Sequence, residues 1–248
     1  MPALLRPQAV LFDLDDTLIT AYRTPQRTWR AIIAEHAEAL GEHDTRWVTA
    51  EVIDRVLAFL SDEEGRKLWR LEGDTTRRRV VRTAFHRLNL ARPTSTAPLH
   101  GADADRIADR FETYLEETIT LKDDAHLVLD RLRHAGLALG LLTNGQSGRQ
   151  RAKLARFGLA RHFDAIQIEE EAGFGKPEPL AYLTLLATLA APPDRAWMVG
   201  DDLLWDIEAP AALGLTTVLL DESGTAAQTA PAHAVITRLA DLPDLLSP

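Results

Sequence analysis

The arrangement of short apolar runs constrains the fold of this chain more than any other feature of its sequence. From about Leu121 onward, these runs alternate with segments long enough to form helices, and one further run opens the chain. Runs with little polar alternation are typical of strands buried on both faces of a parallel sheet. The runs are Ala9–Phe12, Leu137–Leu142, Ala165–Ile168, Ala196–Val199, Thr217–Leu220 and Ala234–Ile236. The pattern therefore predicts an α/β core with a parallel sheet.

The segment from about Ile19 to Thr118 has a different pattern, without a convincing strand. Its apolar residues recur at the spacing of a helix face. Such stretches are Trp29–His36, Val52–Leu60 and Val80–Leu88, with breaks near Gly41–Thr45, Gly73–Thr75 and Pro93–Pro98. We therefore expect an all-helical insertion at residues 20–119, and a core formed by residues 1–19 and 120–248.

Composition limits the classes of function that such a protein can have. With 28 lysines and arginines against 37 aspartates and glutamates, the formal charge is −9, which argues against a surface that grips nucleic acid polymers or anionic lipid. The absence of cysteine excludes disulfides, thiolate metal ligands and thiol nucleophiles. The N-terminal residues have no apolar run suited to a signal peptide, and no stretch approaches the roughly 18 apolar residues of a membrane span. We therefore expect a cytoplasmic protein.

Polar and charged side chains follow four of the predicted strands. In an open parallel sheet, ligands bind beyond the carboxyl ends of the strands, so we expect these segments to converge. The segments are Asp13-Leu14-Asp15-Asp16-Thr17, Thr143-Asn144-Gly145, Gly173-Phe174-Gly175-Lys176-Pro177 and Gly200-Asp201-Asp202, with Asp206 shortly after the last. Together they supply carboxylates, a hydroxyl, an ammonium group and glycine-rich turns to one edge of the sheet.

This set of groups fits a phosphate site that also holds a divalent cation. Facing carboxylates repel one another unless a cation shares the space, and oxygen ligands without cysteine or histidine favour Mg²⁺. Lys176 and the cation would neutralise a phosphoryl dianion, while the Thr143 hydroxyl and backbone N–H groups hold its oxygens. Ser147 and Gln150 have the spacing of a capping box, which predicts a helix N-terminus just after Asn144. A carboxylate nucleophile in such a site would form an aspartyl-phosphate.

Each segment also has a purely structural interpretation. An aspartate-rich turn after a strand is usually a helix cap or an Asx-turn, and Asn144-Gly145 is usually a turn. Lys176, taken alone, is an ordinary surface lysine, and Gly200-Asp201-Asp202 is common where a strand leads into a helix. The functional interpretation depends on the combination of these segments at four strand ends, in a fixed chain order.

These four segments resemble the four motifs of the haloacid dehalogenase superfamily, in that family's chain order and at similar spacing. The resemblance covers roughly residues 1–19 and 120–248, and the helical insertion is similar in placement and type to the family's helical cap. It implies a Rossmann-like core, the haloacid dehalogenase-like fold, with an inserted all-helical cap that sets substrate specificity. Within the superfamily, the chain is similar to the phosphoglycolate phosphatase and pyrimidine 5′-nucleotidase branch.

The resemblance implies a role for each matching position. Asp13 matches the nucleophile, and Asp15 matches the general acid and base. Thr143 and Asn144 match the pair that binds the phosphate, and Lys176 matches the residue that steadies the charges of nucleophile and phosphate. The implied Mg²⁺ ligands are Asp13, the backbone carbonyl of Asp15, Asp201 and Asp206, the last as a second acidic partner of the metal or the lysine.

Two positions depart from the family's pattern. Asp16 stands where many members have glycine, although an acidic residue also occurs there in this branch. Pro210, in Ala209-Pro210, stands where a small Gly-Ala pair is common, and it has no N–H to offer the carbonyl of Asp206. We therefore expect either a helix that restarts near Pro210 or a kinked turn at Asp206.

The implied function is a Mg²⁺-dependent phosphatase that hydrolyses a small phosphomonoester, such as a nucleotide, glycolate or sugar phosphate, through an aspartyl-phosphate. The expected partner is a small phosphorylated metabolite, and we expect a monomer or homodimer. A phosphomutase of the β-phosphoglucomutase type has the same motifs and differs only in its products. A haloacid dehalogenase needs no metal and has an aromatic residue in place of Asp15. A non-catalytic interaction module would not require Asp13, Asp15, Lys176 or Asp201.

The predicted cap contains three consecutive arginines, Arg77-Arg78-Arg79. One of them could bind an anionic part of the substrate, although such a run more often forms a solvated helix face. Trp69, Tyr22 and Arg23 are further candidates for contacts near the hinge or in the cap.

Overall fold

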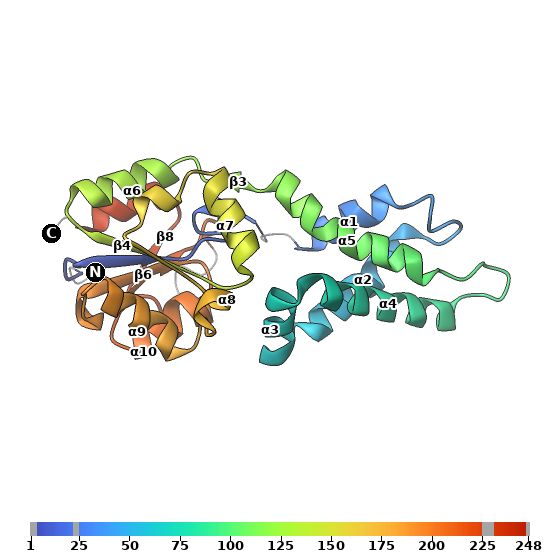
Figure 1. Cartoon of the computed structure of the whole chain (residues 1–248). Coiled ribbons are helices and arrows are strands. Elements are labelled where there is room, and N and C mark those ends of the chain that lie inside the picture. Colours follow the sequence, from blue (N-terminus) through green and yellow to red (C-terminus); the bar gives the residue numbers. More distant parts are fainter. Residues whose placement is uncertain (1–3, 22–24, 225–230, 247–248) are drawn as a thin grey trace. The chain divides into compact units, whose positions relative to one another are not determined.

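The computed structural model describes residues 4–21, 25–224 and 231–246. Its contacts divide the chain into two compact units, one formed by Met1–Ala21 with Thr120–Pro248 and the other by Tyr22–Ile119. We call the first unit the core and the second the cap (Figure 1). Each has its own apolar interior. No helix within the described residues is long and apolar enough to cross a membrane.

The core is built on a six-stranded parallel sheet with the strand order β5-β4-β1-β6-β7-β8. Its strands are β1 (Ala9–Phe12), β4 (Ala138–Thr143), β5 (Ala165–Ile168), β6 (Ala196–Gly200), β7 (Thr216–Leu220) and β8 (Ala234–Ile236). Each corresponds to one predicted apolar run, so the expected Rossmann-like α/β architecture is confirmed. Because β1 lies between β4 and β6, the segments that follow these three strands emerge side by side.

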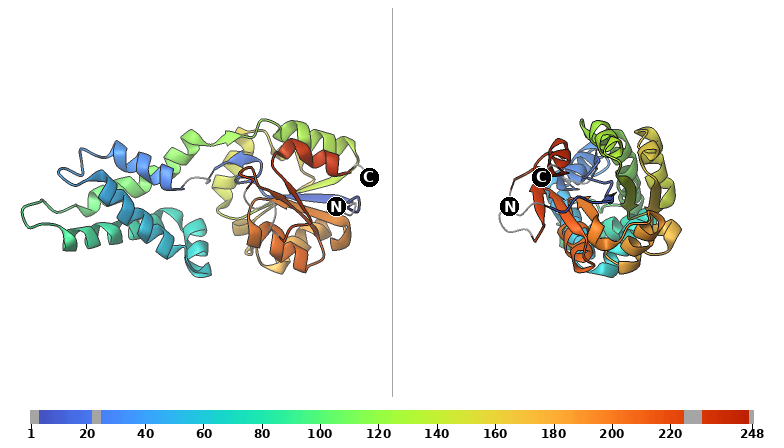
Figure 2. Two further views of the ribbon diagram at one scale, coloured as in Figure 1. Left: turned by 180° about the vertical axis from the view of Figure 1, so that it is seen from behind. Right: turned by 90° about the vertical axis from the view of Figure 1, so that its left-hand side faces the viewer.

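Helices cover both faces of the sheet, which explains why its strands are mostly apolar (Figure 1; Figure 2). Val10 and Phe12 of β1 pack with one group of helices, and Ala9 and Leu11 pack with the other. The first group is α6 (Ala125–His134), α7 (Ser147–Arg156) and the 3₁₀-helix η4 (Leu239–Leu246), and the second is α9 (Pro179–Thr188) and α10 (Ala209–Ala212). Shorter helices in the connections are η1 (Ala160–His162), α8 (Glu169–Ala172) and η2 (Pro193–Arg195).

A second, antiparallel sheet joins the two ends of the insertion within the core. It consists of β2 (Ile19–Thr20) and β3 (Thr120–Leu121), and the hydroxyl oxygens of Thr20 and Thr120 lie 2.6 Å apart. The prediction that no strand lies between Ile19 and Thr118 is therefore wrong at its first residues. A strand this short cannot show period-two alternation, so the sequence carries no signal for it.

The described residues of the cap form helices with a separate apolar interior. These helices are α1 (Pro25–Glu35), α2 (Thr45–Phe59), α3 (Glu63–Leu71), α4 (Gly73–Ala91) and α5 (Gly101–Thr118). Aspartates cap two of them: Asp44 accepts from the N–H of Arg46 in α2, and Asp62 accepts from the N–H of Gly65 in α3. The interior includes Trp29, Ile33, Val52, Val81, Leu88, Ile107 and Phe111.

Arg77 lies inside the cap and not on a solvated face. Only 1% of its surface is exposed, and its guanidinium forms ion pairs with Asp74 at 2.7 Å and Glu112 at 2.8 Å. The same group lies 5.7 Å from the ring centroid of Trp69 and 5.3 Å from that of Phe111. Arg77 therefore connects α3, α4 and α5 within the cap. The interpretation of the arginine run as a solvated face is wrong for this residue.

The two other arginines of the run, Arg78 and Arg79, are exposed. The guanidinium of Arg78 pairs with Asp109 at 2.6 Å, which is typical of a solvated helix face. Of the other candidates, Tyr22 and Arg23 lie outside the described residues.

We expect Arg77→Ala to destabilise the protein far more than Arg78→Ala. Loss of the Arg77 guanidinium removes the cation beside Glu112 and leaves a gap between aromatic rings, which should lower the free energy of unfolding by about 3–5 kcal/mol. The exposed pair of Arg78 contributes about 0–1 kcal/mol. Denaturant unfolding of both variants, followed by circular dichroism, measures the two values. Equal losses would contradict the structural role of Arg77.

Candidate active site

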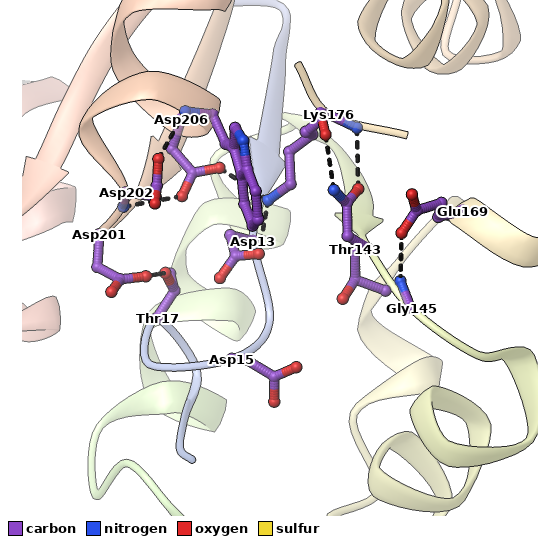
Figure 3. Close-up of polar contacts among 12 residues, drawn as sticks. Asp13, Asp15, Thr17, Thr143, Gly145, Glu169, Lys176, Asp201, Asp202 and Asp206 are labelled. Carbon is purple, nitrogen blue, oxygen red and sulfur yellow. Dashed lines mark hydrogen bonds and ion pairs between the residues drawn. The ribbon is translucent and has the colours of Figure 1, made fainter. Parts of the chain in front are cut away.

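The candidate site lies at the carboxyl ends of β1, β4 and β6. Asp13 follows β1 directly, and its N–H donates to the carbonyl of Val199 on β6 at 3.0 Å. This bond continues the sheet pairing by one residue and fixes the backbone of Asp13. Thr143 ends β4, and Asp201 follows β6 directly. Figure 3 shows how the side chains from these strand ends face one another.

Lys176 places its ammonium group at the centre of the site. The Nζ atom donates to Asp13 Oδ1 at 2.6 Å and to Asp206 Oδ1 at 2.8 Å. Only 2% of the Lys176 surface is exposed. Burial alone would lower the pKa of Lys176, but the ion pairs with Asp13 and Asp206 outweigh burial and raise the pKa above its ordinary value. Lys176 is therefore a permanent cation in this site.

Asn144 holds the backbone that carries Lys176. Its Nδ2 atom donates to the carbonyl of Lys176 at 2.7 Å, and its Oδ1 atom accepts from the N–H of Lys176 at 2.9 Å. These paired bonds connect the end of β4 to the loop before α9. The side-chain amide of Asn144 is thus directed at the backbone of Lys176. Thr143, the other member of the predicted phosphate-binding pair, takes no part in this contact.

Three carboxylates converge beside Lys176. One oxygen from each of Asp13, Asp201 and Asp206 lies within 4.8 Å of the others. Burial raises the pKa of Asp13, and the charges of Asp206 and Asp201 raise it further against the opposing effect of Lys176. Burial also raises the pKa of Asp206. Burial, and then the charges of Asp206 and Asp16, raise the pKa of Asp201 to about 7.

These carboxylates fit a hard divalent cation. The three converging atoms are all carboxylate oxygens, the ligands that hard cations such as Mg²⁺, Ca²⁺ and Mn²⁺ favour. A single ammonium group faces three carboxylates, so a cation would offset both the burial and the mutual repulsion that raise their pKa values. The Thr17 hydroxyl donates to Asp201 Oδ1 at 3.3 Å and orients that carboxylate. Among the described residues, no other cluster of three or more such side chains has this geometry.

Asp206 lies on a π-helix, η3 (Leu203–Glu208), which begins after Asp202. The Asp202 carboxylate accepts from two backbone N–H groups of the first turn, at 2.9 and 2.7 Å. The backbone N–H of Asp202 in turn donates to Asp206 Oδ2 at 3.1 Å. Gly200 leaves room for this arrangement, because an added Cβ would lie 2.2 Å from Cγ of Asp206. The turn and the glycine together fix the carboxylate beside Lys176.

The helix restarts as α10 at Ala209, which is the first of the two outcomes expected at Pro210. In the π-helix, the N–H of Ala209 donates to the carbonyl of Leu204, five residues earlier. By the same spacing, the carbonyl of Trp205 would accept from residue 210, but Pro210 has no N–H. The hydroxyl of Tyr182, from α9, donates to that carbonyl at 2.5 Å. Tyr182 thus replaces the missing N–H and supports the turn that carries Asp206.

Asp15 contacts α7 and not Lys176. Its two carboxylate oxygens accept from Lys153 Nζ at 2.7 and 2.9 Å, and Oδ2 also accepts from Gln150 Nε2 at 3.0 Å. The same Gln150 nitrogen donates to Thr143 Oγ1 at 2.6 Å. Sequence reasoning missed both residues in this role. The available signal is their helical spacing, which places them on one face of α7.

The predicted capping box at Ser147 and Gln150 is wrong. The residue before Ser147 caps α7, and Ser147 is already the first residue of the helix. The N–H of Ser147 donates to Glu170 at 2.7 Å, and the N–H of Gly145 donates to Glu169 at 2.9 Å. Two backbone N–H groups after β4, where the sequence predicts donors to a phosphate, therefore donate to glutamates of α8 instead.

Known proteins of similar sequence place this chain in a family. The family described as haloacid dehalogenase-like hydrolase matches residues 7–214. The chain belongs to this family. It is 32% identical to ribulose-1,5-bisphosphate 5-phosphatase of Halopiger xanaduensis, over 96% of this chain and 99% of that protein. It is 31% identical to N-acylneuraminate-9-phosphatase of Rattus norvegicus, over 98% of this chain and 95% of that protein.

A solved structure shows the same fold over nearly the whole chain. The magnesium-bound HAD-hydrolase YfnB of Bacillus subtilis matches with a TM-score of 0.68 at 24% identity, covering 98% of this chain and 100% of that chain. The predicted superfamily and the predicted class of enzyme, a phosphoric monoester hydrolase, are confirmed.

The backbone at Asp16 explains its departure from the family's pattern. Asp16 has a φ of 66°, in the left-handed region that favours glycine. Aspartate is among the few other residues that adopt this region, because its short side chain can form a local hydrogen bond. Here Asp16 Oδ1 accepts from the N–H of Ala21 at 2.7 Å.

We expect Asp201→Asn to stabilise the metal-free protein at pH 8. The pKa of Asp201 is about 7 in the folded protein, above its unfolded value, so folding favours the protonated form. Stability from this group is therefore lost as the pH rises from about 4 to about 7. Asparagine does not ionise, and the variant should gain on the order of 2 kcal/mol at pH 8 and progressively less toward pH 5. Thermal unfolding in EDTA measures the difference, and a gain that does not vary with pH would contradict this origin.

We expect Tyr182→Phe to lower the free energy of unfolding by about 1–2 kcal/mol, because it removes the hydroxyl donor from the carbonyl of Trp205. Pro210→Ala restores an N–H that can face this carbonyl, so the tyrosine change should have a smaller effect in that background. A double-mutant cycle by denaturant unfolding should give a coupling of about 1 kcal/mol. Strictly additive effects would show that Tyr182 does not compensate for Pro210.

Proposed function

We propose that this chain is a Mg²⁺-dependent phosphatase that hydrolyses small phosphomonoesters through an aspartyl-phosphate on Asp13. The observation that carries the proposal is the buried ion pair between Asp13 and Lys176, at 2.6 Å, beside the carboxylates of Asp201 and Asp206. In-line attack on a phosphate dianion requires a fixed carboxylate, a fixed ammonium group and ligands for a cation. The phosphatase names of the two full-length relatives support the same reaction.

Asp13, Asp201 and the backbone carbonyl of Asp15 would hold the Mg²⁺ ion, with Asp206 as the second acidic partner. When bound, the ion supplies positive charge that offsets the repulsion between the nucleophile and the phosphate. Asp206 Oδ1 already pairs with Lys176 at 2.8 Å, so this residue supports the lysine first.

In the first step, an oxygen of Asp13 attacks phosphorus as the bond from phosphorus to the leaving oxygen breaks. The Asp15 carboxyl gives its proton to that oxygen, so the leaving group departs as an alcohol. Lys176 lies against Asp13 and would attract the phosphoryl oxygens as their charge develops. The product of this step is an acyl phosphate on Asp13.

In the second step, the Asp15 carboxylate takes a proton from water, and the water oxygen attacks the same phosphorus. The bond from phosphorus to the Asp13 oxygen breaks, which releases inorganic phosphate and restores both carboxyl groups. One residue can serve in both steps because each step returns it to the protonation state that the next one needs.

Thr143 and Asn144 contribute to the phosphate site in different ways. The Thr143 hydroxyl can donate to a phosphate oxygen while it accepts from Gln150 at 2.6 Å. Asn144 spends its side-chain amide on the backbone of Lys176, so we assign it the positioning of the lysine. The cap would exclude bulk water and contact the leaving group, which makes it the source of substrate specificity.

A panel of phosphomonoesters with Mg²⁺, assayed for released phosphate, tests the proposal. It should contain nucleoside monophosphates, phosphoglycolate, sugar phosphates and an aryl phosphate. We expect turnover that stops in excess chelator and in Asp201→Ala, because the remaining carboxylates would repel the phosphate. Full turnover in chelator would overturn the metal assignment. An isomerised sugar phosphate without free phosphate would identify a phosphomutase instead.

We expect Asp15→Asn to stop after the first step when an aryl phosphate is the substrate. An aryl group leaves without an acid, so Asp13 is still phosphorylated, but the amide cannot take a proton from water. The expected result is a burst of about one phenol per enzyme, with one phosphoryl group added to Asp13 in the intact-protein mass. Asp13→Asn should show neither. An adduct on any other residue would contradict the mechanism.

A further inference from the structure

We propose that Lys153 and Gln150 of α7 position the Asp15 carboxylate for proton transfer, an assignment that rests on the proposed function. Lys153 Nζ lies 2.7 and 2.9 Å from the two Asp15 oxygens, and Gln150 Nε2 lies 3.0 Å from Oδ2. Neither residue belongs to the segments at the strand ends. They reach Asp15 from a separate element of the core, the helix that follows β4.

These contacts determine the orientation of the carboxylate. Asp15 lies in the turn after β1, where its backbone forms an isolated β-bridge with Ile19, and its side chain projects away from Asp13 (Figure 3). Lys153 contacts both oxygens, so rotation about the Cβ–Cγ bond breaks at least one charge-assisted bond. The side chain of Lys153 is 14% exposed and Gln150 is 3% exposed, so water competes weakly for these donors.

Gln150 also links the proton-transfer residue to the phosphate site. Its Nε2 atom lies 2.6 Å from Thr143 Oγ1, 2.9 Å from the carbonyl oxygen of Asn144 and 3.0 Å from Asp15 Oδ2, so its two hydrogens are shared among three acceptors. One buried side chain therefore sets the separation between the proposed phosphate-binding hydroxyl and the group that handles the proton of the leaving oxygen. Displacement of such a group by about 1 Å can lower a rate by about 100-fold.

The same helix offers a matched control. Arg151 also carries a positive charge on α7, but its guanidinium donates to the two carboxylate oxygens of Glu171 at 2.8 and 2.7 Å. Arg151→Met and Lys153→Met both remove one cation from α7 and place the same side chain on the helix. A difference between the two variants therefore reports the contact with Asp15 and not the charge of the helix.

The experiment compares kcat/KM for an alkyl phosphate and for p-nitrophenyl phosphate, with Mg²⁺, in the wild type and both variants. For each substrate, kcat/KM reports the steps up to loss of the leaving group. Only the alkyl group needs a proton from Asp15, so Lys153→Met should lower kcat/KM for the alkyl phosphate by about 10- to 100-fold and for the aryl phosphate by less than about threefold. Arg151→Met should change neither by more than about twofold.

A second measurement concerns the later step. A misplaced Asp15 also takes a proton from water less well, so Lys153→Met should accumulate phosphorylated Asp13 with the aryl substrate, as seen in the intact-protein mass. The aryl kcat/KM doubles as the test of folding, because an unfolded variant loses it. If Lys153→Met does not fold, Lys153→Gln is measured and interpreted in the same way.

Several results would overturn the assignment. Equal losses for the two substrates would mean that Lys153 supports the site as a whole, and no loss or a gain for the alkyl phosphate would mean that Asp15 does not need it. The same loss in Arg151→Met would assign the effect to charge. A wild type without phosphatase activity would overturn the proposed function itself, and this assignment with it.

Discussion

The buried ammonium group of Lys176 is the interaction on which the rest of this site depends. A charge removed from water is costly unless close partners compensate for the lost hydration, and Lys176 meets Asp13 and Asp206 at 2.6 and 2.8 Å. These partners come from the end of β1 and from the π-helix η3, while Asn144 at the end of β4 holds the lysine backbone. One cation therefore fixes three strand ends relative to one another. The sheet provides the strand ends in the right order, and the ion pairs set their final positions.

The same centre holds more negative than positive charge, and this imbalance connects stability to function. Burial and neighbouring carboxylates raise the pKa of Asp201 to about 7, so the folded core holds the ionised form of this carboxylate at a cost in free energy. Apolar packing on both faces of the sheet has to offset this cost. A divalent cation would relieve the repulsion among these carboxylates. It should therefore release protons from them on binding and stabilise the folded protein. Under the proposed function, binding of a cation and a phosphoryl group would therefore gain free energy from relief of this repulsion.

The sequence predicts the parts of this structure that depend on neighbours in the chain. Apolar runs locate all six core strands, and the order of polar segments brings Asp13 and Lys176 to one edge of the sheet. The contacts that the sequence does not predict involve partners far away in the chain. Ser147 has the spacing of a capping box, but its N–H donates to Glu170 of another helix. Pro210 shows that a donor is missing, yet only the fold identifies Tyr182 as its replacement. Arg77 sits among charged neighbours, but it shares a helix face with apolar residues and so lies inside the cap.

The point of insertion keeps the cap helices and the site residues of the core in separate units of the chain. The chain leaves the core after Ala21 and returns at Thr120, and β2 and β3 pair with each other at this point. The attachment is therefore fixed by the core's own hydrogen bonds, whatever helices lie between. Asp13, Lys176 and the α7 residues that contact Asp15 all belong to the core, while Arg77 and its partners stabilise the cap from within. Under the proposed function, substitutions on the cap surface can change which phosphomonoester is accepted without disturbing the ion pairs that hold the nucleophile.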